Sequence, residues 1–213
     1  MIATQKNRHA ALRERLIDAA ERNIAANGLA GLRARELAGE AGCAVGTIYN
    51  VFEDLDELIL CVGSRTLAML DTALGAVGLA RPYGSAEEAA VDLVRLALAY
   101  LEFAASHTVR WRALFEHRMS EARPLPQWFV EQQHQLFAQV ERPLVTLLPD
   151  LDPDARRTLA RTLFSAVHGI VALGLEEKLV SLPFTDLRRQ LAATVRAITT
   201  GRVELRSIDS AGE

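Results

Sequence analysis

The sequence has little cysteine and lacks the residue patterns that metal and covalent chemistry require. Cys43 and Cys61 are its two cysteines among 213 residues, and they form no CxxC pair. A disulfide framework is therefore excluded, and a reducing compartment, the cytoplasm, is expected. The five histidines show no HExxH or i, i+4 pairing, so we expect neither a metal nor a cofactor. With no GxSxG motif and no glycine-rich phosphate loop, we predict that the protein is not an enzyme.

Long uncharged apolar runs and a signal-peptide apolar region are also missing, so we expect no membrane span. Half of the residues are apolar, which is enough for a sizeable core in one or two domains. The net charge is −3, but residues 1–50 carry seven Lys or Arg against five acids, which leaves −5 on the remainder. A mildly basic end on an acidic body suits a protein that presents one end to a polyanion.

Helical periodicity runs through the chain without an alternating strand pattern, so the predicted fold class is all-α with about nine helices. A mobile arm is expected over residues 1–7 and a disordered tail over 203–213. The helices between them are expected at about 8–27, 33–40, 44–50, 54–77, 85–104, 109–119, 127–148, 153–180 and 185–200. Asp54-x-x-Glu57 and Ser85-x-x-Glu88 are capping boxes, and Asp152 before proline is an N-cap.

The stretch 32–58 organises the chain as two short helices, a tight turn and the start of a third helix. Gly42 supplies the positive φ that ends the first helix. In the second helix we expect Val45, Ile48 and Phe52 to point inward. Two helices joined by a short glycine-containing turn form a helix-turn-helix unit, whose second helix enters the DNA major groove.

Residues at fixed spacing along this stretch carry a family resemblance. They are Glu36-Leu37-Ala38, Ala41-Gly42, Val45-Gly46-Thr47-Ile48-Tyr49, Phe52 and Leu58, preceded by Ile17-x-x-Ala20 and Asn27-Gly28. This pattern resembles the DNA-binding domain of TetR-type transcriptional regulators. The resemblance implies a DNA-binding domain over 8–70, a ligand-binding and dimerisation domain over 71–202, and a homodimeric repressor that leaves a palindromic operator when a small effector binds. The alternatives are a helical interaction or ligand-sensing module with weak or lost DNA binding and, least favoured, a helical enzyme.

The resemblance also implies which residues contact DNA. Thr47 and Tyr49 match positions whose hydroxyls commonly bond phosphates, while Val45, Gly46 and Asn50 face the groove. There Asn50 could bond an adenine edge and Val45 could touch a thymine methyl. The full candidate set is Lys6, Arg8, Arg33, Arg35, Ala44, Val45, Gly46, Thr47, Tyr49 and Asn50.

Three positions depart from the family pattern. Leu32-Arg33 replaces a usual Thr or Ser cap, Ala44 replaces a frequent Ser, and Leu55 replaces a Lys that usually contacts phosphate. Leu55 lies inside the run Glu53-Asp54-Leu55-Asp56-Glu57, whose four acids would repel nearby phosphates. We therefore expect modest DNA affinity with a steep salt dependence.

The second part of the chain holds aromatic residues with a few polar groups among them, which suits a mostly apolar small-molecule effector. For each single residue, ordinary core packing is the alternative. The candidate lining is Phe103, His107, Trp111, Phe115, His117, Trp128, Phe137 and His168. The helix that starts near residue 54 is expected to be the only element that spans both domains, and so to transmit effector binding.

The last two helices mix small residues with more apolar residues than one core-facing stripe requires. This predicts a homodimer built as a four-helix bundle with two helices from each copy; burial inside one copy is the alternative. The candidate interface residues are Leu163, Ala166, Val167, Ile170, Leu191, Val195 and Ile198.

Overall fold

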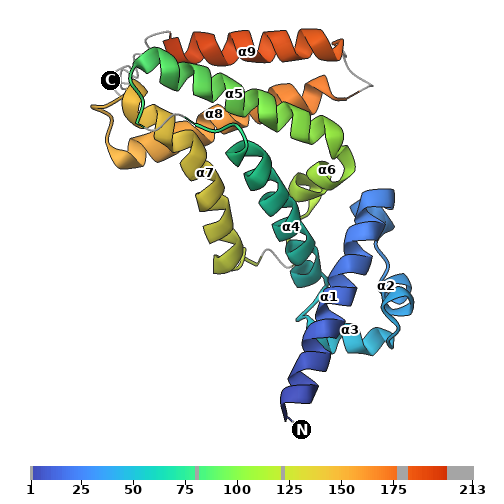
Figure 1. Cartoon of the computed structure of the whole chain (residues 1–213). Helices are drawn as coiled ribbons and strands as arrows, with labels where there is room; N and C mark the ends of the chain where they lie inside the picture. Colours follow the sequence, from blue (N-terminus) through green and yellow to red (C-terminus); the bar gives the residue numbers. More distant parts are fainter. Residues whose placement is uncertain (1, 80–81, 121–122, 177–181, 201–213) are drawn as a thin grey trace, which may run out of the picture. The chain divides into compact units, whose positions relative to one another are not determined.

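The computed structural model describes residues 2–79, 82–120, 123–176 and 182–200 (Figure 1). Within these ranges the chain forms nine α-helices and one short 3-10 turn and no strand, which confirms the all-α prediction. The elements are α1 Ile2–Asn27, η1 Leu29–Gly31, α2 Ala34–Ala41, α3 Val45–Val51, α4 Leu55–Gly75, α5 Ala86–Ser106, α6 Thr108–Glu116, α7 Gln127–Leu147, α8 Pro153–Gly174 and α9 Phe184–Thr200.

Most predicted helix boundaries agree with the structure to within three residues, and two do not. Helix α1 begins at Ile2, so the predicted arm over 1–7 is wrong; residues 2–7 contain no Gly or Pro that would stop a helix. Helix α8 ends at Gly174, six residues before the predicted end at 180. The tail predicted to be disordered, 203–213, lies outside the described residues.

The chain divides into two compact units. Unit 1 comprises Met1–Thr72 and Phe103–Leu136, and unit 2 comprises Ala73–Glu102 and Phe137–Glu213. The functional division near residue 70 that the sequence suggests stays a prediction.

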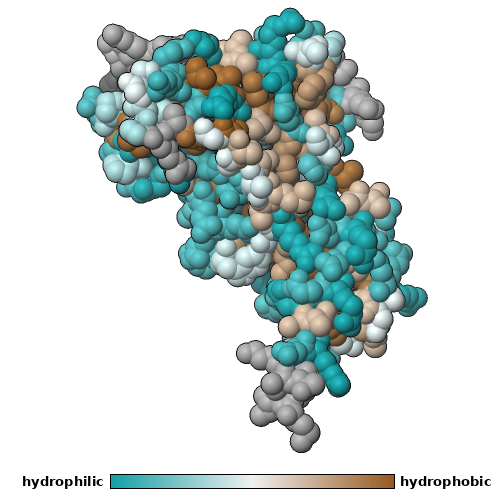
Figure 2. All heavy atoms as spheres, in the orientation of Figure 1, coloured by the Kyte–Doolittle hydropathy of each residue, from teal (hydrophilic) through white to brown (hydrophobic). Residues whose placement is uncertain are grey.

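A single apolar core holds the first three helices and the start of α4 together in unit 1. Its largest fully buried side chains include Leu16 and Ile24 from α1, Leu37 from α2, and Ile48 from α3. Phe52, which follows α3, is 2% exposed, and the Arg13 guanidinium lies 5.1 Å from its ring centroid, a cation–π distance. Tight packing on α1 therefore fixes the direction of α2 and α3. In Figure 2 the visible surface of this region is mainly hydrophilic.

Helix α6 also contacts α1 in unit 1. Arg110 of α6 donates from Nη1 to Glu21 Oε1 of α1 at 2.6 Å. Glu21 also accepts a hydrogen bond from Arg65 of α4 at 2.7 Å, and Arg65 contacts Asp18 and Glu14 as well, at 2.6 and 2.8 Å. For the two units given above, the prediction that the helix starting near residue 54 is the only element that spans both domains is wrong, because α5 and α7 also contribute residues to both units.

Helix α4 is the one described helix that is long and apolar enough to cross a membrane, judged by length and composition alone. The helix contains Asp56, Glu57, Arg65 and Asp71, so it is not a long uncharged run of the kind that the sequence analysis found missing. Core helices of soluble proteins meet the same criterion, however. In α4 the side chains of Leu58, Val62 and Leu70 are buried in the protein interior. Its Arg65 lies in the network of carboxylates just described. Packing thus accounts for much of its apolar content.

Candidate nucleic-acid interface and ligand site

The turn between α2 and α3 has the geometry that the sequence predicts. Gly42 lies in the left-handed region, with φ 68° and ψ 41°. Its N–H donates to Gly39 O at 3.2 Å, and Cys43 N donates to Ala38 O at 2.9 Å. These bonds satisfy the last carbonyls of α2 while the chain reverses. Helix α3 can therefore begin at Val45, three residues after the turn glycine.

Helix α3 has one buried face and one exposed face. Ile48 is fully buried and Phe52 is 2% exposed, as predicted. The prediction that Val45 also points inward is wrong, since it is 38% exposed. Cys43, just before α3, packs against the core instead and occupies the inward position at this end of the helix.

The exposed face of α3 brings several predicted DNA contacts together. Tyr49 is 51% exposed, and Ala44, Gly46 and Asn50 are exposed beside it, while Thr47 is half-buried. A side chain at Gly46 would meet no atom within 4 Å, so the helix backbone is accessible there.

The predicted basic residues lie on α1 and at the start of α2. Arg8 and Arg35 are exposed, whereas the side chain of Lys6 lies outside the described residues. Arg33 is exposed too, but its Nη1 donates to Ala30 O and Leu32 O at 2.7 and 2.9 Å. Arg33 and Ala44 occupy the N-cap positions of α2 and α3, and neither makes a side-chain cap hydrogen bond. The two missing caps are therefore confirmed.

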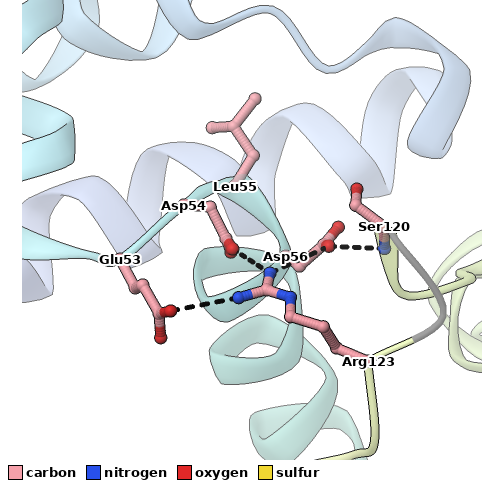
Figure 3. Close-up of a pocket in the computed structure, with 6 residues that line it drawn as sticks. All are labelled: Glu53, Asp54, Leu55, Asp56, Ser120 and Arg123. Carbon is pink, nitrogen blue, oxygen red and sulfur yellow. Dashed lines mark hydrogen bonds and ion pairs between the residues drawn. The ribbon is translucent and has the colours of Figure 1, made fainter.

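The acidic run that follows α3 is paired rather than unopposed (Figure 3). Asp54 Oδ1 accepts from Glu57 N at 2.9 Å and Glu57 Oε2 accepts from Glu53 N at 2.8 Å, a capping arrangement at the start of α4. Arg123 contacts Asp54 and, at 3.1 Å, Glu53. Arg123 thus offsets part of the charge of the acidic run, and the expectation that these acids repel nearby phosphates stays a prediction. Sequence reasoning missed Arg123 because it lies about 70 residues away from these acids in the chain.

The same cluster extends to the segment after α6. Asp56 is 7% exposed; its Oδ2 accepts from Ser120 N at 2.7 Å, and its Oδ1 lies 3.6 Å from His117 Nε2. Burial lowers the pKa of His117, although the neighbouring Asp56 and Asp54 act in the opposite direction. The residues Glu53, Asp54, Leu55, Asp56, Ser120 and Arg123 line a hollow of about 340 Å³.

Hydrogen bonds outweigh burial in their effect on the pKa of Asp54. Burial alone would raise the pKa of Asp54, but hydrogen bonds from Glu57 N and Arg123 lower it below its usual value. The pKa of Arg123 is raised, chiefly by its hydrogen bond to Asp54. Asp54 is therefore held as a carboxylate. In the part of the chain that the structure describes, no group of three or more His, Cys, Asp or Glu could hold a metal.

The predicted ligand residues of unit 1 separate into buried and exposed side chains. Phe103 is 5% exposed and stacks on His107, with ring centroids 4.7 Å apart. Trp111 is 2% exposed and meets Phe115 edge to face at 5.6 Å. Phe115 itself is 44% exposed, and Trp128 of α7 is 42% exposed. Phe103 and Trp111 thus pack as core residues, the alternative that the sequence left open.

In unit 2, Phe137 and His168 belong to one aromatic cluster through Phe164, which the sequence analysis did not select. Phe164 contacts Phe137 edge to face at 5.3 Å and stacks on His168 at 5.8 Å. Tyr100, also missed, lies edge to face with Phe164, and its hydroxyl is 2.8 Å from His168 Nδ1. Burial lowers the pKa of His168. Phe164 stands one helical turn before His168, a spacing that could have indicated it.

Two residues predicted for the dimer interface are buried within the chain. Leu191 is 0% and Val195 is 5% exposed, so their assignment to the interface is wrong. The inner face of α9 packs on α8 of the same chain. Five candidates remain partly or fully exposed: Leu163, Ala166, Val167, Ile170 and Ile198. Leu173 of α8 is a larger exposed apolar residue, at 60%.

Comparisons with known proteins agree with this architecture. Residues 16–62 match the family model described as bacterial regulatory proteins, tetR family, and residues 93–198 match a tetracyclin repressor-like C-terminal domain. None of the curated proteins matches the chain.

Solved structures provide further matches. A protein of unknown function from Rhodococcus sp. RHA1 is 24% identical, with 87% of this chain and 93% of that chain covered and a TM-score of 0.66. A TetR family protein from Vibrio parahaemolyticus is 25% identical, with coverages of 87% and 96% and a TM-score of 0.57. The multidrug binding protein EbrR, solved with imidazole, is 22% identical, with coverages of 85% and 93% and a TM-score of 0.57.

Proposed function

This chain belongs to the TetR family of bacterial transcriptional regulators, and we propose that it is a cytoplasmic repressor that binds a palindromic operator as a homodimer. The observation that carries the DNA part of this proposal is the exposed face of α3. It presents Val45, Tyr49 and Asn50 to solvent, while Ile48 and the left-handed turn at Gly42 hold the helix on the core. A short helix held this way can enter a major groove.

In this proposal the contacts to DNA divide into two kinds. Hydroxyls of Thr47 and Tyr49 and the guanidinium groups of Arg8 and Arg35 bind phosphates, which supplies most of the affinity. Val45 and Asn50 reach base edges, and Gly46 allows the helix backbone to approach the groove. Arg33 contributes less, because its guanidinium is engaged with the carbonyls of the preceding turn.

The homodimer proposal rests on the outer face of α8. Ala166 is exposed, Ile170 is partly exposed and Leu173 is 60% exposed. They lie at helical spacings of three and four residues, so they share one face of the helix. A second copy would cover this apolar row, and a two-fold symmetric contact places two DNA-reading helices on one duplex.

The effector proposal rests on the cluster of Tyr100, Phe137, Phe164 and His168 in unit 2. Aromatic rings with one polar pair suit a mostly apolar molecule that needs a single orienting hydrogen bond. Because burial lowers the pKa of His168, its imidazole is neutral near pH 7. The neutral His168 imidazole and the Tyr100 hydroxyl form a polar pair without charge, which suits an uncharged ligand.

Effector binding would act by shifting a population. An effector with higher affinity for the arrangement that cannot bind DNA moves the equilibrium toward that arrangement, with a coupling typically of about 1–3 kcal/mol. Two elements could pass the change to α1–α3. Helix α4 follows α3 in the chain, and α6 is tied to α1 by the Arg110–Glu21 pair.

The test is fluorescence anisotropy of a labelled duplex from the region upstream of the protein's own gene. We expect binding that weakens steeply between about 50 and about 200 mM salt. Tyr49→Phe should weaken it about tenfold, because it removes one hydrogen bond to a charged phosphate and leaves the ring. Arg35→Ala should also weaken binding and reduce its salt dependence, whereas Arg142→Ala, at an exposed site on α7, should not.

A second candidate is a helical ligand-sensing module with weak or lost DNA binding. The observation that favours it is the pair of missing side-chain caps at Arg33 and Ala44. Each such cap usually stabilises a helix by about 1 kcal/mol. Absence of salt-dependent binding to the duplex at low salt would support this candidate and contradict the repressor.

A further inference from the structure

The acids at the start of α4 lie close to the proposed DNA-reading helix. Glu53 stands three residues after Asn50, and its side chain is 77% exposed. Three residues span at most about 11 Å, close to the Debye length of about 8–10 Å near physiological salt. Carboxylates at this position therefore interact with phosphates that α3 contacts, and their compensation affects DNA binding.

One guanidinium provides most of this compensation. Arg123 Nη1 lies 3.1 Å from Glu53 Oε1, and Nη2 contacts Asp54 Oδ2 and lies 3.6 Å from Asp56 Oδ2. Figure 3 shows these three carboxylates turned toward the guanidinium, with Leu55 pointing away. A guanidinium stays charged at every pH of interest. The cluster thus contains one permanent positive charge, which is supplied by a residue about 70 positions away in the chain.

The same contacts fix the position of the acids. Ser120 N donates to Asp56 Oδ2 at 2.7 Å. The Asp56 carboxylate is therefore held both by this backbone N–H and by the nearby Arg123 guanidinium. Asp54 also caps α4 through the Glu57 N–H. Arg123 binds carboxylates that are already oriented by these other bonds.

We propose that Arg123 is a positioning residue for DNA binding that acts through Glu53, Asp54 and Asp56. The proposal rests on the proposed DNA-binding function. Arg123 does not contact phosphate; it offsets the negative charge beside α3 and holds the carboxylates of Glu53, Asp54 and Asp56 around its guanidinium. The Glu53 side chain is 77% exposed, so its ion pair with Arg123 contributes little to folding stability and acts mainly on DNA affinity and its salt dependence. The side chains of Asp54 and Asp56 are 31% and 9% exposed, so their contacts with Arg123 also stabilise the fold.

The test compares Arg123→Gln, Arg123→Lys and the double variant Arg123→Gln/Glu53→Gln with the unmodified full-length protein. Binding is measured by anisotropy with the labelled upstream duplex. Arg157→Gln is the matched control, because it removes the same charge from an exposed pair with Asp154 on α8. Thermal melting of each variant reports whether the fold is retained.

We expect Arg123→Gln to weaken binding about fivefold at about 50 mM salt and less than about twofold at about 200 mM, because added salt screens the exposed acids. Arg123→Lys should retain most of the affinity. Removing the Glu53 carboxylate in the Arg123→Gln background should restore part of it. A purely structural role for Arg123 would not produce this recovery, since the second change replaces no lost contact. Arg157→Gln should bind as the unmodified protein does.

The outcomes are distinguishable. If the unmodified protein binds the duplex and Arg123→Gln binds equally well at both salt concentrations, the inference is overturned while the proposed function stands. If Arg123→Gln loses binding and Glu53→Gln recovers none of it, Arg123 acts as a structural residue and the inference is again overturned. If the unmodified protein shows no salt-dependent binding, the proposed function fails and the inference fails with it.

Discussion

The turn between α2 and α3 depends on one residue in the left-handed conformation, Gly42. Replacing this glycine with alanine measures the free-energy cost of that conformation for a residue with a side chain. Gly42 has φ 68°, and a methyl group added to it would meet no atom within 4 Å. The cost of Gly42→Ala therefore comes from the backbone alone. An L-residue in the left-handed region costs about 1–2 kcal/mol, and the stiffer unfolded chain offsets about 0.4–1 kcal/mol of this. We expect a net loss of about 1 kcal/mol in the free energy of unfolding.

Gly39→Ala is the matched control. Gly39 lies three residues earlier, inside α2, and a methyl group there also meets no atom within 4 Å. Its backbone is helical, so alanine should raise the free energy of unfolding by about 1 kcal/mol. The same added methyl group thus has opposite effects at the two positions.

Thermal unfolding followed by far-ultraviolet circular dichroism measures both effects. In a chain of this size, about 1 kcal/mol corresponds to about 2–4 °C. Gly42→Ala should melt lower by that amount and Gly39→Ala higher. If both variants shift the melting temperature in the same direction, the left-handed turn does not control the stability of the motif and the reasoning is refuted.

Three further predictions concern unit 2. Gly174→Ala would place a methyl group 2.5 Å from a Leu187 methyl that is buried, so the urea midpoint should fall by the equivalent of about 1–3 kcal/mol; an unchanged midpoint would show that α8 and α9 approach less closely. Leu173→Glu should convert the proposed homodimer to a monomer in sedimentation velocity, and a dimer that persists in this variant would exclude this face of α8 as the interface. Because burial lowers the pKa of His168, the unfolded state takes up its proton first, and stability should fall as pH drops below about 6.5. His168→Gln should flatten this loss in urea midpoints measured near pH 5 and pH 8, and an unchanged slope would contradict it.

Features that depend on neighbouring residues could be predicted from the sequence. The reversal at Gly42 requires one glycine at the end of a helix, and the cap at Asp152 requires an acid before proline; the structure has both. The capping arrangement of Asp54 and Glu57 likewise forms within four residues. In each case the physical cause lies within one turn of helix, so the pattern and the contact coincide.

Features that depend on contacts between distant segments could not be predicted. Nothing near Glu53 indicates that Arg123, 70 residues away, would pair with it. Periodicity shows that α9 has an apolar face, but Leu191 could lie equally well against its own chain or against a second copy. Val45 fits the inward spacing with Ile48, yet Cys43 occupies that position. Each outcome depends on which surfaces meet in three dimensions.

The most direct test of the central claim is hydroxyl-radical footprinting of the region upstream of the gene. A homodimer with two copies of α3 should protect two backbone clusters on one face of the duplex, with centres about 34 Å apart or a multiple of that, related by two-fold symmetry. Arg35→Ala should weaken both clusters equally. A single protected cluster, or no protection at low salt, would contradict the proposal that two helix-turn-helix units bind one operator.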